Sequence, residues 1–219
     1  MRSALFLSLI GALLALLGVV ERGWFLLPCW FGLSFLWLGI SHALGKHNPF
    51  QKRADGTIPR WTVALHLPFF CYMNAVWHGL RILSKEPAQS QVAEQLVVGR
   101  RLLESEITGE FVNYVDLTCE FSESSKARKM AGYVCFPILD AGAPSPERLK
   151  AAVRSLPPGR TCVHCAQGHG RTGLFALAFL LINGLTNTVE DGLRMLRHVR
   201  PGIDLNAQQK RCIELLARS

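Results

Sequence analysis

The 219-residue sequence has no internal repeat and no low-complexity run, which excludes repeat architectures. Its seven cysteines are odd in number and lack the regular spacing of a disulfide framework or a zinc site. We therefore expect free thiols, a reducing compartment and no metal. The length leaves room for one ordinary domain and an additional segment.

The chain combines a net charge of +8 with a positive mean hydropathy, an unusual pairing for a soluble domain. A basic balance indicates nucleic acid, anionic lipid or an acidic substrate as the partner. The apolar residues are concentrated in the first eighty positions, which favours membrane lipids over nucleic acid.

Two apolar stretches open the chain. Residues 3–20 contain no charged side chain and are long enough for a short membrane span. A cleavable signal peptide is the alternative, but only Arg2 precedes the stretch and no clear small-residue cleavage site follows it. Residues 24–45 begin with aromatic side chains typical of a membrane interface. We expect a hairpin of two transmembrane helices within a membrane region of residues 1–85.

A third apolar stretch, about residues 61–83, has two interpretations. It contains polar or helix-disrupting residues that are costly at mid-bilayer, namely His66, Pro68, Asn74 and His78. The preceding loop is basic and therefore expected on the cytoplasmic side: Lys46, Lys52, Arg53 and Arg60. An interfacial or re-entrant segment keeps the following domain cytoplasmic, whereas a third span moves it across the membrane. We favour the interfacial segment.

Residues 86–91 form a polar linker, and residues 92–219 alternate strand and helix patterns. Strands are expected at about 94–99, 111–118, 132–138 and 161–165. Ser145, Thr188 and Asn206 are each placed to cap the start of a helix. This alternation predicts an α/β domain of about 130 residues.

The segment 161–173 predicts a phosphate site. A short strand leads into a loop with Gly168 and Gly170, and then into a buried helix. The backbone amides of such a loop converge on one point, where the helix N-terminus adds positive potential. We expect the residues Ala166, Gln167, Gly168, His169 and Gly170 to surround the phosphate.

Two reactive side chains flank this loop. Cys165, at the helix N-terminus beside Arg171, is expected to be a thiolate that attacks phosphorus and forms a cysteinyl-phosphate. Arg171 is expected to hold two phosphate oxygens. Thr172 would donate its hydroxyl to the sulfur, and His164 would orient the loop from behind.

A second group must protonate the leaving oxygen. Asp140 lies in a glycine- and proline-containing loop directly after an expected strand. Its carboxyl group would donate this proton and afterwards activate the attacking water. Asp140 as a simple turn residue is the alternative.

The motif His164-Cys165-x5-Arg171-Thr172 resembles the signature of the cysteine-based protein tyrosine phosphatase superfamily, especially its dual-specificity branch. The similarity extends to segments 96–102, 115–120, 137–145 and 200–209. It implies a three-layer α/β/α domain over residues 92–219, preceded by the transmembrane helices, with no cofactor. It also implies Cys165 as nucleophile, Arg171 as phosphate binder and Asp140 as acid and base, and it suggests Gln209 or Asn206 for positioning water.

The substrate remains open at this stage. The loop positions Ala166, Gln167 and His169 offer no lysine, which favours a singly phosphorylated group. The resemblance favours a phosphorylated protein, and a membrane location favours a phospholipid such as phosphatidylglycerophosphate or a phosphoinositide. An inactive phosphate-binding membrane module is a third reading. The sequence does not indicate the oligomeric state.

Two smaller questions concern buried residues. Cys162 is expected to be a packing residue, but Cys162, Cys119 or Cys135 could also act as a resolving thiol that protects Cys165 from oxidation. Asp116 is expected to be structural, because it lies in a buried strand.

Overall fold

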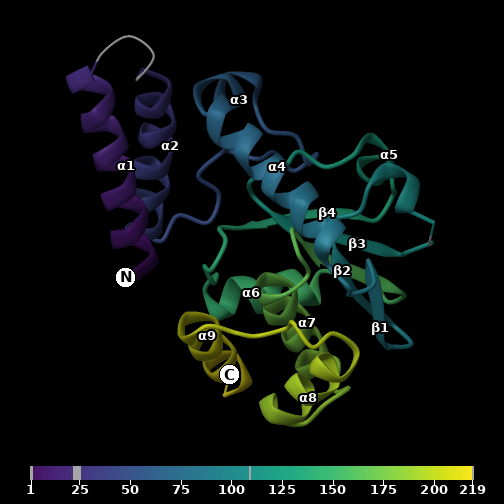
Figure 1. The fold of residues 1–219 in the computed structure, drawn as a ribbon. Coiled ribbons are helices and arrows are strands. Elements are labelled where there is room, and N and C mark those ends of the chain that lie inside the picture. The colour runs from purple at the N-terminus through teal and green to yellow at the C-terminus, as the bar shows by residue number, and fades with distance from the viewer. Residues whose placement is uncertain (1, 22–25, 109, 219) are drawn as a thin grey trace.

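The computed structural model describes residues 2–21, 26–108 and 110–218 (Figure 1). A helical hairpin, α1 (Arg2–Glu21) and α2 (Leu26–Ala43), lies beside an α/β unit. Helices α3 (Arg60–Leu65) and α4 (Leu67–Leu83) connect the two in sequence. The expected α/β fold is confirmed.

The α/β unit is built on a five-stranded sheet with the order β1-β2-β5-β3-β4. The strands are β1 (Gln89–Ala93), β2 (Leu96–Arg100), β3 (Asn113–Thr118), β4 (Tyr133–Ile138) and β5 (Thr161–Cys165). Strands β2, β5, β3 and β4 are parallel, and β1 pairs antiparallel at one edge. Every residue of β2, β3 and β5 is buried, as expected of parallel strands covered on both faces.

Four helices cover one face of the sheet: α6 (Pro146–Arg154), α7 (Gly170–Ile182), α8 (Val189–Val199) and α9 (Ala207–Ala217) (Figure 1). The main core lies between them and strand residues such as Leu96, Val115 and Val163. The short helices η2 (Glu104–Glu106) and α5 (Ser125–Arg128) belong to the opposite face, where Val97, Tyr114 and Cys162 are buried.

The predicted helix starts are confirmed by their caps. The Ser145 hydroxyl accepts from the amide of Arg148, and the Thr188 hydroxyl accepts from that of Asp191. Asn206 and Gln209 form a reciprocal capping box at α9. The predicted linker was partly wrong, because its last three residues, 89–91, belong to edge strand β1.

The α1–α2 hairpin packs closely through glycines. A Cβ at Gly11 would lie 2.6 Å from the carbonyl oxygen of Gly32, so the two helix backbones are almost in contact. Many large apolar side chains on the outside of the hairpin are exposed, among them Leu5, Leu9 and Leu13. The predicted segments 3–20 and 24–45 are thus helical over 3–20 and 26–43; residues 44 and 45 form a turn, and residues 24 and 25 lie outside the described residues.

The prediction of transmembrane helices is not supported. Within the described ranges 2–21, 26–108 and 110–218, no helix has the length and apolar character needed to cross a membrane. The third apolar stretch, 61–83, is divided into α3 and α4 at His66. Three residues of α4 are buried, namely Phe69, Phe70 and Trp77.

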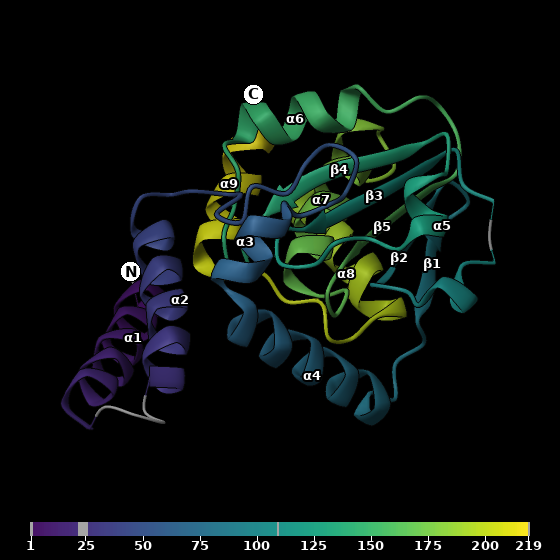
Figure 2. The same ribbon diagram turned by 90° about the horizontal axis from the view of Figure 1, so that it is seen from above.

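Helix α4 runs along one side of the α/β unit, and the hairpin lies beyond one of its ends (Figure 2). On one side, the rings of Phe35 and Phe69 meet edge to face with centroids 5.8 Å apart. On the other, the indole Nε1 of Trp77 donates to the carbonyl of Ala166 at 3.1 Å. This helix therefore contacts the glycine-rich loop directly.

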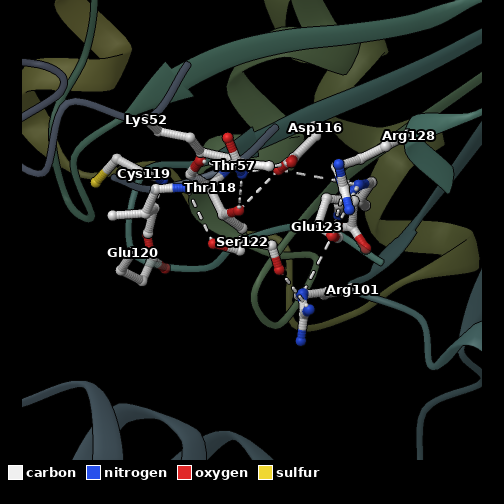
Figure 3. Close-up of polar contacts among 12 residues, drawn as sticks. Lys52, Thr57, Arg101, Asp116, Thr118, Cys119, Glu120, Ser122, Glu123 and Arg128 are labelled. Atoms are coloured by element: carbon white, nitrogen blue, oxygen red, sulfur yellow. Dashed lines mark hydrogen bonds and ion pairs between the residues drawn. The ribbon is translucent and has the colours of Figure 1, made fainter. Parts of the chain in front are cut away.

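The basic loop before α3 also enters the α/β unit. Lys52 was expected in a solvated cytoplasmic loop, but it is buried, and its ammonium group donates to Asp116 and Thr118 of β3 (Figure 3). Asp116 is structural in this arrangement. Burial acts to raise its pKa, but the Lys52 ammonium, His164 and the hydrogen bonds from Lys52 and Thr118 together outweigh burial and hold the pKa well below its usual value.

Candidate active site

The glycine-rich loop lies at the carboxyl ends of the parallel strands, the usual edge for binding sites in such sheets. Strand β5 ends at Cys165, and α7 begins at Gly170. The backbone amide of Arg101, just beyond β2, donates to the carbonyl of Cys165 at 2.7 Å and fixes the start of the loop.

The carbonyl groups of the loop are bound from outside it. Arg200 donates to the carbonyl oxygens of Gln167 and Gly168, each at 2.9 Å. The Ala166 carbonyl accepts from Trp77. Because the C=O and N–H of one peptide group point in opposite directions, these contacts turn the following amides toward the inside of the loop. The predicted ring of amides around an anion is consistent with this geometry.

Gly168 is required by both its conformation and its surroundings. Its φ is +76°, and a Cβ there would lie 2.5 Å from the carbonyl carbon of Gly99 in β2. Its amide donates to the sulfur of Cys165 at 3.3 Å. Cys165 itself is almost fully buried.

The guanidinium group of Arg171 is held in a fixed orientation. Its two terminal nitrogens bind both carboxylate oxygens of Glu120, at 2.8 and 2.7 Å. Burial acts to raise the pKa of Glu120, but Arg171 outweighs it and the pKa lies below its usual value. The Nε of Arg171 is buried and has no hydrogen-bond partner among the described residues. That donor is therefore available to an anion.

Asp140 lies at the same site. Its carboxylate is 3.2 Å from Nη2 of Arg171 and is largely exposed. The next residue, Ala141, has a φ of +58°, a strained conformation for a residue with a side chain. Asn206 donates to the carbonyl of Ala141 and Gln209 to that of Gly142, at 2.8 and 3.2 Å. The sequence suggested Gln209 for placing water; here its side-chain amide holds the loop that carries Asp140.

Thr172 and His164 stand behind the loop. The Thr172 hydroxyl is buried without a hydrogen-bond partner in the described part of the chain, and its predicted bond to sulfur stays a prediction. His164 is fully buried, with Nε2 4.0 Å from Asp116 and 3.7 Å from Glu123. Burial lowers the pKa of His164 despite these two carboxylates, which favours a neutral ring.

Asp116, Glu123 and His164 place their ligand atoms within 4.8 Å of one another, as a metal site would. However, two basic side chains already supply positive charge to the carboxylates of this cluster. Lys52 binds Asp116, and the Nε of Arg101 lies 3.5 Å from Glu123 (Figure 3). This cluster is therefore a buried ion-pair network beneath the loop.

A cavity of about 320 Å³ opens above the loop and exposes the catalytic candidates. Cys165, Arg171 and Asp140 line it together with Gln167, His169 and Gly170. The opposite wall is apolar and comes from α4: Met73, Val76, Trp77 and Leu80. The guanidinium of Arg101 lies 4.9 Å from the centre of the Trp77 ring and holds this wall in place.

His169 also lines this cavity, but its ring is already engaged. Nε2 lies 2.7 Å from a carboxylate oxygen of Glu86, and Glu86 also accepts from the amide of Gly202. The imidazole is thus tied to Glu86, and phosphate binding by the backbone of His169 stays a prediction.

The other cysteines near the loop do not resemble reactive thiols. Burial raises the pKa of Cys162 to about 12 and that of Cys135 to about 11, and it also raises the pKa of Cys119. All three are free thiols. Because a resolving thiol must ionise to attack, these pKa values favour the packing interpretation of Cys162.

Sequence reasoning missed three residues that build the site. Glu120 orients Arg171, Arg200 organises the loop carbonyls, and Trp77 joins α4 to the loop. Glu120 and Arg200 lie inside segments that resemble the phosphatase superfamily. Their opposite charges, if expected to be buried, would have indicated that each binds a partner at the site. Nothing in the local sequence around Trp77 indicates its partner 89 residues away.

Comparison with known proteins agrees with this site. The sequence model of the protein-tyrosine phosphatase family matches residues 137–216, which include Asp140, the glycine-rich loop and α9. No curated protein sequence matches the chain significantly.

Three solved structures share the fold of the α/β unit. They are the active form of Tk-PTP (21% identity, TM-score 0.52), a variant of human DUSP28 (15%, 0.52) and PTPMT1 in complex with PI(5)P (17%, 0.51). Each alignment covers 60% of this chain and 97, 95 and 96% of the respective structure, so the rest of this chain has no counterpart in them. The likeness to these structures shows the fold, and the family match over residues 137–216 supports a hydrolase of the cysteine-based phosphatase type.

Proposed function

We propose that this protein hydrolyses phosphomonoesters in two displacement steps through a phosphorylated Cys165. The observation that carries the proposal is the convergence of three groups on one cavity: the Cys165 sulfur, the inward-facing loop amides and the unpartnered Nε of Arg171. The amides and the guanidinium bind the three non-bridging oxygens and stabilise their charge in the transition state.

In the first step, the thiolate of Cys165 attacks phosphorus and the bond to the leaving oxygen breaks. Asp140, in its protonated form, gives its proton to that oxygen, so the product leaves as a neutral alcohol. Arg171 lies between Glu120 and Asp140 and links the phosphate to both carboxylates.

In the second step, the Asp140 carboxylate accepts a proton from water as the water attacks the cysteinyl-phosphate. The sulfur leaves as a thiolate, which the amide of Gly168 stabilises; the hydroxyl of Thr172, which has no partner among the described residues, would serve as a second donor. The chain then returns to its starting state with inorganic phosphate bound.

The test is hydrolysis of p-nitrophenyl phosphate by the purified full chain. We expect Cys165→Ser to abolish turnover, while Cys71→Ser, an exposed cysteine on α4, serves as the matched control with unchanged activity. Rapid quenching followed by peptide mass spectrometry should find phosphate on Cys165. An inactive wild-type protein, or an active Cys165→Ser variant, would refute the mechanism and favour an inactive phosphate-binding module.

We further propose that the substrate carries a single phosphate. The loop side chains include no lysine that would bind a second phosphate group. The dual-specificity resemblance supports a phosphorylated protein, and the apolar α4 wall of the cavity supports a lipid. Parallel assays with a phosphotyrosyl peptide, phosphatidylglycerophosphate and a phosphoinositide compare these classes.

We also propose that the α1–α2 hairpin attaches the chain to a membrane, with the catalytic unit on the cytoplasmic face. The exposed apolar side chains of α1 support attachment, and the free cysteines support a reducing compartment. Carbonate extraction of a membrane fraction tests attachment, and a reporter fused after Pro87 tests the side. Release of the protein by carbonate, or a reporter signal from the opposite side, would contradict the respective part.

A further inference from the structure

A second cavity adjoins the catalytic one. It has a volume of about 340 Å³ and lies between the hairpin, α4 and the loop 139–141. Its size falls within the roughly 300–1,000 Å³ of small-molecule sites. Its walls are mostly apolar and include Leu7, Phe35, Leu38, Phe69, Met73 and Leu139.

The two cavities share lining residues. Met73, Glu120 and Asp140 line both, so the catalytic site and the apolar cavity meet at Asp140. Asp140 is also the group that protonates the leaving oxygen in the proposed mechanism. The part of the substrate attached to that oxygen is therefore placed at the mouth of the second cavity.

The chemistry of the walls selects the occupant. Among the described residues that line the second cavity there is no lysine or arginine, and the basic side chain there is His42, so a further phosphate group would meet no permanently charged cation and would lie near the carboxylates of Glu120 and Asp140. A peptide chain would bring backbone amides and carbonyls that lose their water and need hydrogen-bond partners. The wall side chains Phe35, Leu38 and Leu139 offer none, whereas a hydrocarbon chain needs none.

We propose that this cavity binds the hydrocarbon chain of a lipid phosphomonoester whose phosphate lies on the loop 166–171. The proposal rests on the proposed phosphatase function and assigns its substrate class. Residues of α1 and α2 contribute to the cavity, so the hairpin is part of the substrate site.

The experiment measures kcat/KM of the full chain for n-alkyl phosphates of increasing chain length, below their critical micelle concentrations. These substrates differ only in the number of methylene groups. Burial of one additional methylene group should raise kcat/KM by about three- to fourfold. We expect kcat/KM to rise by about that factor per carbon and then to level off once the cavity is full.

Two variants that place a tryptophan on α2 distinguish binding of the alkyl chain in the cavity from its nonspecific partitioning into lipid or detergent. Leu38→Trp fills the cavity, whereas Leu33→Trp changes an exposed residue that does not line it. The readout is the ratio of kcat/KM for dodecyl over ethyl phosphate within each variant, which does not depend on the amount of folded enzyme. We expect this ratio to fall at least tenfold in Leu38→Trp and to stay unchanged in Leu33→Trp.

Each outcome is decisive. A flat chain-length series, or equal ratios in both variants, overturns the hydrocarbon site. So does a phosphotyrosyl peptide that is hydrolysed with a higher kcat/KM than dodecyl phosphate. Activity on p-nitrophenyl phosphate, which has no alkyl chain, is measured alongside: if it is absent the phosphatase proposal fails, and if it is present with a flat series only the substrate assignment fails.

Discussion

Arg171 has two carboxylate partners with different surroundings. Glu120 is buried and binds both terminal nitrogens, while Asp140 is exposed and contacts only one of them. A buried carboxylate that accepts two hydrogen bonds fixes the orientation of the guanidinium group. An exposed carboxylate can exchange protons with a substrate and with water. The two acids therefore differ in burial and in their contacts with Arg171, and in the proposed mechanism only the exposed one, Asp140, transfers a proton.

This difference gives a prediction for Asp140→Asn. Without the acid, a substrate with a poor leaving group must expel an alkoxide, so kcat for an alkyl phosphate should fall by about 10²–10⁴-fold. Hydrolysis of p-nitrophenyl phosphate should fall much less, because nitrophenolate leaves without a proton. Steady-state assays with both substrates measure the contrast, and Asp191→Asn on exposed α8 is the control. Equal losses on the two substrates would remove Asp140 as the proton donor.

His164 gives a pH prediction for stability. Its pKa is lowered from 6.5, chiefly by burial, with Lys52 and Arg101 acting in the same direction and Asp116 and Glu123 against it. As the pH falls below 6.5 the unfolded chain takes up a proton that the folded chain does not, so His164 lowers stability as pH falls toward its folded pKa.

Urea unfolding between pH 7.5 and 5 tests this. The free energy of unfolding of the wild type should decrease relative to that of His164→Asn, with a slope of up to about 1.4 kcal/mol per pH unit. Parallel curves for the two proteins would show that the buried ring does not titrate differently on folding.

At the scale of elements, the loop before α3 belongs to the core of the α/β unit. The Lys52 ammonium group is completely buried against Asp116, which also accepts from the hydroxyl of Tyr133 at 2.8 Å. Removing one partner of a buried pair leaves the other charge uncompensated.

Lys52→Met should therefore lower the free energy of unfolding by about 3–5 kcal/mol, measured by urea denaturation. The adjacent Arg53→Met is the matched control, because Arg53 is exposed and its loss should change stability by less than about 0.5 kcal/mol. If both variants are equally stable, the pair contributes nothing to holding the loop.

The elements that the sequence predicted well are those with local signals. The caps at Ser145, Thr188 and Asn206 each act within three residues, and the buried strands follow from their apolar runs. Strand β1 was missed because Gln89–Ala93 is polar and lies at an edge, where only its pairing with β2 makes it a strand. The position of Lys52 depends on a partner 64 residues away, which no local pattern reveals.

The contacts of helix α4 were also not predictable from the local sequence. Its hydrophobicity is visible in the sequence, but the sequence does not say whether lipid or protein covers it. The answer comes from Trp77 and Met73, which face the catalytic loop and its cavity, while Ile82 and Leu83 stay exposed. Cys165 and Arg171 were easier to bring together from the sequence, because their spacing around one loop is itself a local pattern, and both line the same cavity.

At the scale of the whole molecule, the segments before residue 86 complete the catalytic unit. A chain of residues 46–219 keeps Lys52 and α4, whereas a chain of residues 86–219 loses both. We expect the shorter chain to be less stable by at least about 3–5 kcal/mol, because Asp116 is left without its ammonium partner. Thermal and urea unfolding of the two chains compare them. Equal stability would show that the catalytic unit folds independently of these segments.

The apolar wall that α4 adds to the catalytic cavity has a consequence for inhibitors. A simple phosphate mimic would contact only the loop amides and Arg171, which any protein with this loop presents in similar form. A compound that joins such a mimic to an aryl or alkyl group would also contact Met73, Val76 and Leu80. That part of its affinity would depend on a helix outside the family-matched segment, so it is the part that would make an inhibitor selective for this protein.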